Sequence, residues 1–224
     1  MILQPSDQSG LTMTHAQSAV RDSSKTYMTQ SPKPLKLDKE LTQKLRSFIL
    51  IKAKPGSEQE IQNRLKALPE VREIHLITGK FDLLITLESQ ETELDPRQRV
   101  VGLVLEAVRK GGGVVDTRTI IPIDSQYRPR TQTGRPSIKA FVFIQSEAGK
   151  EKELMSKLLE LPEVTGVHLL FGKADLLTEL DAEKSFVHPP PQHVASLVQT
   201  KISKLPGIRD TDTYVPLESI TKNV

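Results

Sequence analysis

The sequence predicts an α+β protein made of two tandem copies of one small βαββαβ unit, each with an antiparallel sheet. Two observations support this fold class. The segment Arg46–Glu88 can be laid on Lys139–Asp181 without a gap, with the identical residues falling in blocks. After a one-residue slip, Gly113–Ile123 (GVVDTRTIIPI) matches Gly207–Leu217 (GIRDTDTYVPL). Each copy shows the same succession of apolar runs and amphipathic stretches, which indicates one repeated fold.

The first half of each unit is expected to be a strand followed by a helix. Phe48–Ala53 and Ala140–Ile144 are short runs rich in Phe, Ile and Val, which favour strands. In the first copy Ser57 and Glu60 form a capping-box pattern at the start of a helix. Pro69 ends that helix, because proline disrupts its hydrogen bonding.

The second half of each unit is expected to contain two strands, a helix and a last strand. Gly79-Lys80 suits a tight hairpin between the two strands, and Asp95-Pro96 suits an N-cap and first turn. The order βαββαβ is that of ferredoxin-like domains, with a four-stranded sheet and both helices on one face. The expected bounds in the first copy are strands Arg72–Thr78, Asp82–Glu88 and Arg118–Ile123, with the helix ending before Gly111.

The first strand is apolar on both of its faces. Phe48 and Leu50 point to one side, whereas Ile49 and Ile51 point to the other. The helices cover only one face, and a sheet with a solvated face would alternate apolar and polar residues. We therefore expect the second face to pack on the sheet of the sister copy, as in a dimeric α/β barrel. The pairing would form either an intramolecular pseudo-dimer or a homo-oligomer.

Composition sets the expected domain boundaries. The N-terminal stretch is polar and rich in Ser, Thr and Gln, which predicts disorder, although Leu37, Leu41 and Leu45 follow helical spacing. The stretch between the copies is rich in Pro, Arg and Thr, which indicates a linker. The expected divisions are an N-terminal segment 1–44, a first domain 45–124, a linker 125–137 and a second domain 138–220.

Charge and composition exclude several functional classes. The 31 basic and 28 acidic side chains nearly balance, which argues against direct binding to nucleic acid or to anionic membranes. The absence of cysteine removes disulfides, thiolate catalysis and cysteine-ligated metals. No run of roughly 18 apolar residues suits a membrane span. We expect a cytoplasmic protein.

Two short blocks carry a family resemblance. Leu68–Val71 (LPEV), a strand and then Thr78–Leu84 (TGKFDLL) occur in the order seen in the ligand-binding (RAM) domain of Lrp/AsnC regulators. The stretch Asp116–Thr119 (DTRT) resembles the end of that domain. The resemblance covers roughly residues 46–123 and 139–217. The first 45 residues lack the apolar spacing of a helix-turn-helix, so we expect no direct DNA binding. Two hypotheses remain open: the chain senses a ligand alone, or it co-assembles with a DNA-binding relative.

The resemblance implies a small effector, commonly an amino acid, bound near the glycine-containing hairpins. Backbone N–H groups near a glycine could hold its carboxylate, and an aspartate could hold its ammonium group. The second copy departs from the pattern, because Phe171 replaces Thr78 and Ala174 replaces Phe81. The implied ligand-binding residues are Thr78, Gly79, Lys80, Phe81, Asp82, Thr117 and Thr119, and then Gly172, Lys173, Asp175, Thr211 and Thr213.

Structural roles compete with ligand binding at the hairpins. Asp82 and Asp175 either bind an effector's ammonium group or cap backbone donors of the turn, and the sequence leaves both open. Gly79 and Gly172 supply the positive φ of a tight hairpin, which is compatible with the approach of a ligand.

The histidines do not suggest a metal or catalytic centre. His75 and His168 occupy equivalent strand positions without further ligands at metal-binding spacing, so we expect them to be packing residues. His188 and His193 flank three prolines that prevent helical spacing, which indicates a loop. We expect no catalytic residues, no metal and no cofactor.

The sequence as a whole favours a non-enzymatic small-molecule sensor associated with transcription regulation. The alternatives are a structural oligomerisation partner of DNA-binding relatives and a dimeric α/β-barrel enzyme. Such enzymes use aromatic residues inside the barrel, and this chain has only 4% aromatic residues and no Trp. The ACT domain is a further amino-acid binder of this topology, but Pro55-Gly56 lacks its usual acidic lead-in.

Overall fold

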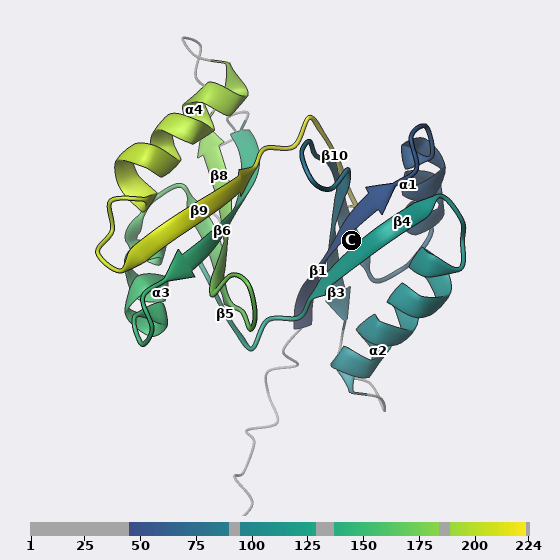
Figure 1. Ribbon diagram of the computed structural model, residues 1–224, viewed down its shortest axis with the longest axis horizontal. Coiled ribbons are helices and arrows are strands. Elements are labelled where there is room, and N and C mark those ends of the chain that lie inside the picture. Colours follow the sequence, from purple (N-terminus) through teal and green to yellow (C-terminus); the bar gives the residue numbers. More distant parts are fainter. Residues whose placement is uncertain (1–44, 90–94, 129–136, 184–188, 223–224) are drawn as a thin grey trace, which may run out of the picture. The chain divides into compact units, whose positions relative to one another are not determined.

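The computed structural model describes residues 45–89, 95–128, 137–183 and 189–222 (Figure 1). The segment 1–44, with its expected disorder and short helix, lies outside the described residues, and so does His188. The loop expected at His193 was wrong: this residue lies in the helix Pro190–Leu197, because prolines are tolerated in the first turn of a helix. The first copy contains β1 (Leu45–Ala53), α1 (Glu58–Lys66), β2 (Val71–Leu76), β3 (Leu83–Ser89), α2 (Pro96–Leu103), the π-helical segment η1 (Val104–Arg109), β4 (Val114–Ile120) and β5 (Asp124–Tyr127). The second contains β6 (Ser137–Ser146), α3 (Glu151–Glu160), β7 (Val164–Leu169), β8 (Leu176–Glu183), α4 (Pro190–Leu197), η2 (Val198–Ile202), β9 (Ile208–Tyr214) and β10 (Glu218–Thr221).

Both sheets are antiparallel, which confirms the predicted α+β class with two ferredoxin-like units. The sheets have five strands, however, in the orders β10-β2-β3-β1-β4 and β5-β7-β8-β6-β9 (Figure 1). The prediction of four strands was wrong because the two copies exchange their last strands. The expected linker accordingly begins with a strand, since Asp124–Tyr127 pairs with β7. An exchanged strand satisfies the N–H and C=O groups that an edge strand would otherwise leave unpaired.

The two faces of each sheet are buried in different ways. Ile49 and Ile51 belong to a core cluster of the first copy that includes helical residues from α1 and α2. Phe48 and Leu50 belong instead to a cluster that also contains Phe141 from β6. The predicted pairing of the sheets is therefore confirmed within one chain, and the second apolar face of each sheet packs on its sister.

Of the two predicted helix-capping patterns, one was confirmed and one was wrong. Asp95 is the N-cap of α2 and accepts a hydrogen bond from the backbone N–H of Arg97 at 2.9 Å, as predicted. The prediction of a capping box at Ser57 was wrong, because Ser57 has helical dihedral angles and its side chain makes no capping hydrogen bond. The strand expected at Arg118–Ile123 is β4, which begins earlier, at Val114, and ends earlier, at Ile120.

Candidate functional site

The glycine-containing hairpins connect β2 to β3 and β7 to β8. Gly79 has a φ of 116° and Gly172 a φ of 130°, and nothing lies within 4 Å of a Cβ built at either residue. Both glycines are therefore needed for the turn conformation, which L side chains rarely adopt. They bring Lys80 and Lys173 to equivalent positions at the two hairpin tips.

The two hairpin aspartates bind backbone donors. Asp82 accepts hydrogen bonds from the Ala53 backbone N–H at 2.8 Å and from the Lys52 ammonium at 2.9 Å. Asp175 accepts hydrogen bonds from the backbone N–H and the hydroxyl of Ser146, at 2.7 and 3.2 Å. These contacts tie each hairpin to the first strand of its copy. An effector-binding role for either carboxylate stays a prediction.

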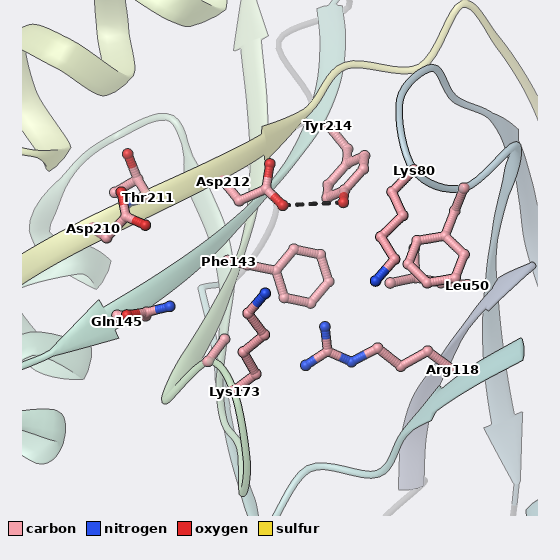
Figure 2. A pocket seen from close by; sticks show the side chains of 12 residues that line it. Leu50, Lys80, Arg118, Phe143, Gln145, Lys173, Asp210, Thr211, Asp212 and Tyr214 are labelled. Atoms are coloured by element: carbon pink, nitrogen blue, oxygen red, sulfur yellow. Dashed lines mark hydrogen bonds between the residues drawn. The ribbon is translucent and has the colours of Figure 1, made fainter.

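A cavity of about 320 Å³ lies at the hairpin tips, between the inner faces of the two sheets (Figure 2). Its volume falls near the lower end of the ~300–1,000 Å³ typical of small-molecule sites. The first copy contributes Leu50, Lys80, Phe81 and Arg118, and the second contributes Phe143, Gln145, Lys173, Ala174, Asp210, Thr211, Asp212 and Tyr214.

Three cationic side chains give the cavity its electrostatic character. The ends of Lys80, Arg118 and Lys173 lie around one space beside the ring of Phe143 (Figure 2). Within the part of the chain that the structure describes, none of them forms an ion pair with a carboxylate. The Lys80 ammonium lies 5.7 Å from the centroid of the Phe81 ring. An unpaired cluster of this kind suits an anionic ligand.

An acidic group faces this cluster. The Tyr214 hydroxyl donates a hydrogen bond to Asp212 at 3.0 Å. Burial, together with the charge of Asp212, raises the pKa of Tyr214 to about 12, so the hydroxyl keeps its proton at neutral pH. Asp210 accepts a hydrogen bond from the Thr211 backbone N–H at 2.9 Å. The cavity therefore offers donors for carboxylates and an acceptor for an ammonium group.

The structure brings together only part of the residue set that the sequence implied. Lys80, Phe81, Lys173 and Thr211 line the cavity. The others do not: Thr78, Gly79, Asp82, Thr117, Thr119, Gly172, Asp175 and Thr213.

Sequence reasoning also missed Arg118 and Asp212, although both lie in the repeated motif. Leu50 pairs with Arg118 across β1 and β4, so Arg118 shares the inner face with Leu50. Thr117 and Thr119 therefore point to the helical side, and strand alternation could have directed attention to the residue between them.

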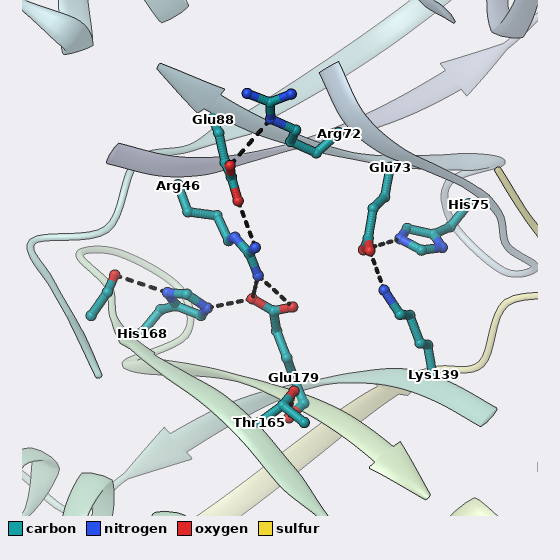
Figure 3. A network of polar contacts seen from close by, with 10 residues as sticks. Arg46, Arg72, Glu73, His75, Glu88, Lys139, Thr165, His168 and Glu179 are labelled. Atoms are coloured by element: carbon teal, nitrogen blue, oxygen red, sulfur yellow. Dashed lines mark hydrogen bonds and ion pairs between the residues drawn. The ribbon is translucent and has the colours of Figure 1, made fainter. Parts of the chain in front are cut away.

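A second polar cluster lies farther along the same inner faces (Figure 3). His168 contacts Ser125 of β5 through Nδ1 at 2.9 Å and Glu179 through Nε2 at 2.9 Å. His75 makes the equivalent contacts, to Ser219 of β10 at 2.8 Å and to Glu73 at 3.2 Å. The histidines are buried, as expected, and they additionally link each exchanged strand to a glutamate.

The two glutamates of this cluster form ion pairs between the copies. Arg46 binds Glu179 of the second copy at 2.8 Å and Glu88 of its own copy at 2.7 Å, and Lys139 binds Glu73. Burial alone would raise the pKa of Glu179, but the hydrogen bond with His168 and the charge of Arg46 outweigh it and lower this pKa to about 2. These ion pairs satisfy the buried charges that the sheet pairing encloses.

The two glutamates lie on strands that are not equivalent in the two copies. Glu73 lies on β2, whereas Glu179 lies on β8, the counterpart of β3. Glu73 pairs with Thr86, whereas at the equivalent positions Gly166 pairs with Glu179. A Cβ at Gly166 would lie 3.4 Å from the Glu179 carboxylate and 3.2 Å from the Tyr127 ring. Gly166 therefore leaves room for a glutamate that enters from the neighbouring strand.

A larger hollow of about 530 Å³ includes Arg46, Asp95 and Asp124 in its lining. Arg46 is bound to two glutamates, and Asp95 and Asp124 accept hydrogen bonds from nearby backbone N–H groups. Its charged groups are thus largely used for structure. Among the described residues, no group of three or more His, Cys, Asp or Glu side chains is placed to hold a metal ion. No described helix is long and apolar enough to cross a bilayer.

Comparison with known proteins agrees with the topology and with the repeated motifs. The family model of the Lrp/AsnC ligand binding domain matches residues 46–94 and 139–224. The chain belongs to this family. An uncharacterized HTH-type transcriptional regulator of Pyrococcus abyssi is 29% identical over 82 residues, covering 35% of this chain and 51% of the regulator. One from Pyrococcus horikoshii is 30% identical over 78 residues, covering 34% and 49%.

The Lrp/AsnC chain described here thus spans about half the length of the curated relatives it matches. Among solved structures, the siroheme decarboxylase NirDL matches with a TM-score of 0.59 at 14% identity, covering 81% of this chain and 74% of that one. Its complex with an iron-uroporphyrin III analogue matches with a TM-score of 0.57 at 12% identity, covering 81% and 73%. At these identities the likeness shows a shared fold alone.

Proposed function

We propose that this Lrp/AsnC-family chain is a non-enzymatic sensor that binds a small carboxylate-bearing effector, such as an amino acid, between its two sheets. The observation that carries the proposal is the cluster formed by Lys80, Arg118 and Lys173 around a small, half-apolar cavity. Cations without carboxylate partners repel one another, so a bound anion would stabilise the folded protein.

The regulatory part of the proposal rests on family membership. The two curated relatives are described as HTH-type transcriptional regulators. In this proposal the chain transmits effector binding to a DNA-binding relative by co-assembly, without contacting DNA itself. The near balance of its charges, at a net +3, supports a protein partner over nucleic acid.

Thermal melting against a panel of amino acids, followed by isothermal titration, tests the sensor proposal. A true effector at a hundredfold excess over its Kd should stabilise the protein by about 2.7 kcal/mol. Arg118→Gln should weaken that binding at least tenfold. Arg209→Gln, which removes the same charge from an exposed position of β9 outside the cavity, should not.

The outcomes separate the alternatives. If neither amino acids nor dicarboxylates raise the melting temperature, the sensor proposal fails and a structural oligomerisation partner becomes the better account. A purified protein with an absorbing cofactor that turns over would favour a dimeric α/β-barrel enzyme instead.

A further inference from the structure

We infer that Arg118 and Asp212 hold one ligand in a single orientation, and that this ligand is a dicarboxylic amino acid bound once per chain. The inference deepens the proposed function and depends on it. It starts from the position of the cavity relative to the repeat. Lys80 and Lys173 are equivalent residues of the two copies, and so are Leu50 and Phe143, yet all four line one cavity. The cavity is therefore shared by the two copies.

At one pair of equivalent positions, the two copies carry side chains of opposite charge. Arg118 in the motif DTRT corresponds to Asp212 in DTDT, and both line the cavity. Two identical halves would place two arginines or two aspartates there. Because the halves are fused and have diverged, one ligand meets a cation from the first copy and a carboxylate from the second. Such a site distinguishes the two ends of a ligand.

A second equivalent pair differs in size in the same cavity. Phe81 is buried at the tip of the first hairpin, whereas Ala174 stands at the same place in the second. The smaller side chain removes bulk on the side that also contributes Asp212. Charge and space thus both differ between the two sides, which favours an asymmetric ligand.

The balance of charge defines the ligand class. Arg118 and the two lysines offer three cationic groups, and a guanidinium binds a carboxylate through two parallel hydrogen bonds. Asp212 is held by the Tyr214 hydroxyl, which leaves its other oxygen for an ammonium group. Asp210 is occupied by a backbone N–H group. A ligand with two carboxylates and one ammonium group complements these cationic and acidic side chains. Glutamate and aspartate have these groups and are small enough for the cavity of about 320 Å³.

The test compares L-glutamate with glutarate, which keeps both carboxylates but lacks the ammonium group, and with L-glutamine, which lacks one carboxylate. Isothermal titration of the full chain should give one L-glutamate per chain, with glutarate and L-glutamine each at least tenfold weaker. Asp212→Asn should remove the preference of L-glutamate over glutarate. Asp212→Arg should reverse it, because the equivalent positions would then both carry arginine.

Asp116→Asn is the matched control, since Asp116 is an exposed aspartate on β4 outside the cavity. This variant should keep the preference of the unmodified chain for L-glutamate over glutarate. Melting without ligand checks that every variant is folded. Equal affinity for L-glutamate and glutarate, two ligands per chain, or an unchanged preference in Asp212→Asn would overturn the inference while leaving the sensor proposal intact. Failure of all amino acids and dicarboxylates to bind would reject the sensor proposal as well.

Discussion

The buried ion pairs between the two copies should make folding stability depend on Glu179. Its side chain is only 6% exposed, and it contacts both Arg46 and His168 (Figure 3). Glu179→Gln keeps the shape of the side chain but removes its charge, which leaves Arg46 with Glu88 alone. Removing one partner of a buried ion pair typically costs about 3–5 kcal/mol. Because Glu88 remains, we expect a loss near 3 kcal/mol at pH 7.

The pH dependence supplies an independent measure of the same contacts. The pKa of Glu179 is about 2 in the folded protein, against an ordinary value of 4.5. Because the folded protein binds fewer protons, the stabilisation is complete above pH 4.5 and is lost as the pH falls towards 2. A shift of this size corresponds to roughly 3 kcal/mol. The stability of Glu179→Gln should therefore fall less between pH 5 and pH 3 than that of the unmodified chain.

Urea denaturation at pH 7, 5 and 3 provides the assay, with the midpoint and slope both recorded. Glu153→Gln is the control, since Glu153 also forms two ion pairs, with Lys150 and Lys157, but lies on the surface of α3. Exposed pairs contribute little, so this variant should stay near the unmodified chain. If the two variants lose equally little stability, the buried network does not hold the sheets together and the reasoning is refuted.

Three further predictions concern the packing between the sheets, the exchanged strand β10 and the contact that holds the second hairpin. Phe48→Ala removes a fully buried ring that contacts Phe141 and His168, so it should cost about 3–5 kcal/mol in urea denaturation, whereas Phe171→Ala, at 92% exposure, should cost almost nothing. Removing residues 217–224 exposes the edge of β2, so size-exclusion chromatography should show association that increases with concentration beyond that of the full chain. An elution profile that matches that of the full chain would contradict the role of β10 in covering this edge. Asp175→Asn should lower the melting temperature by weakening the tie to Ser146, and an unchanged value would count against that tie.

The sequence by itself determined the repeat, the βαββαβ order of the first elements in each copy and the two apolar faces. These features are local or periodic: the hydrophobic pattern of Phe48–Ile51 specifies which face each side chain takes, and Asp95-Pro96 starts a helix through its own backbone. The match between the copies then extended each assignment to the other half. Lys80 and Lys173 could be proposed as site residues because the hairpin motif that contains them resembles that of the Lrp/AsnC ligand-binding domain.

Only the tertiary structure decided the strand exchange and the composition of the cavity. β5 and β10 are short and polar, and their pairing is decided by the open edge they fill in the other copy, which no local pattern records. Arg118 and Asp212 meet in one cavity because two sheets distant in sequence close over it. A residue's neighbours across a sheet interface depend on how two whole faces pack, whereas its direction on a strand depends on the backbone alone.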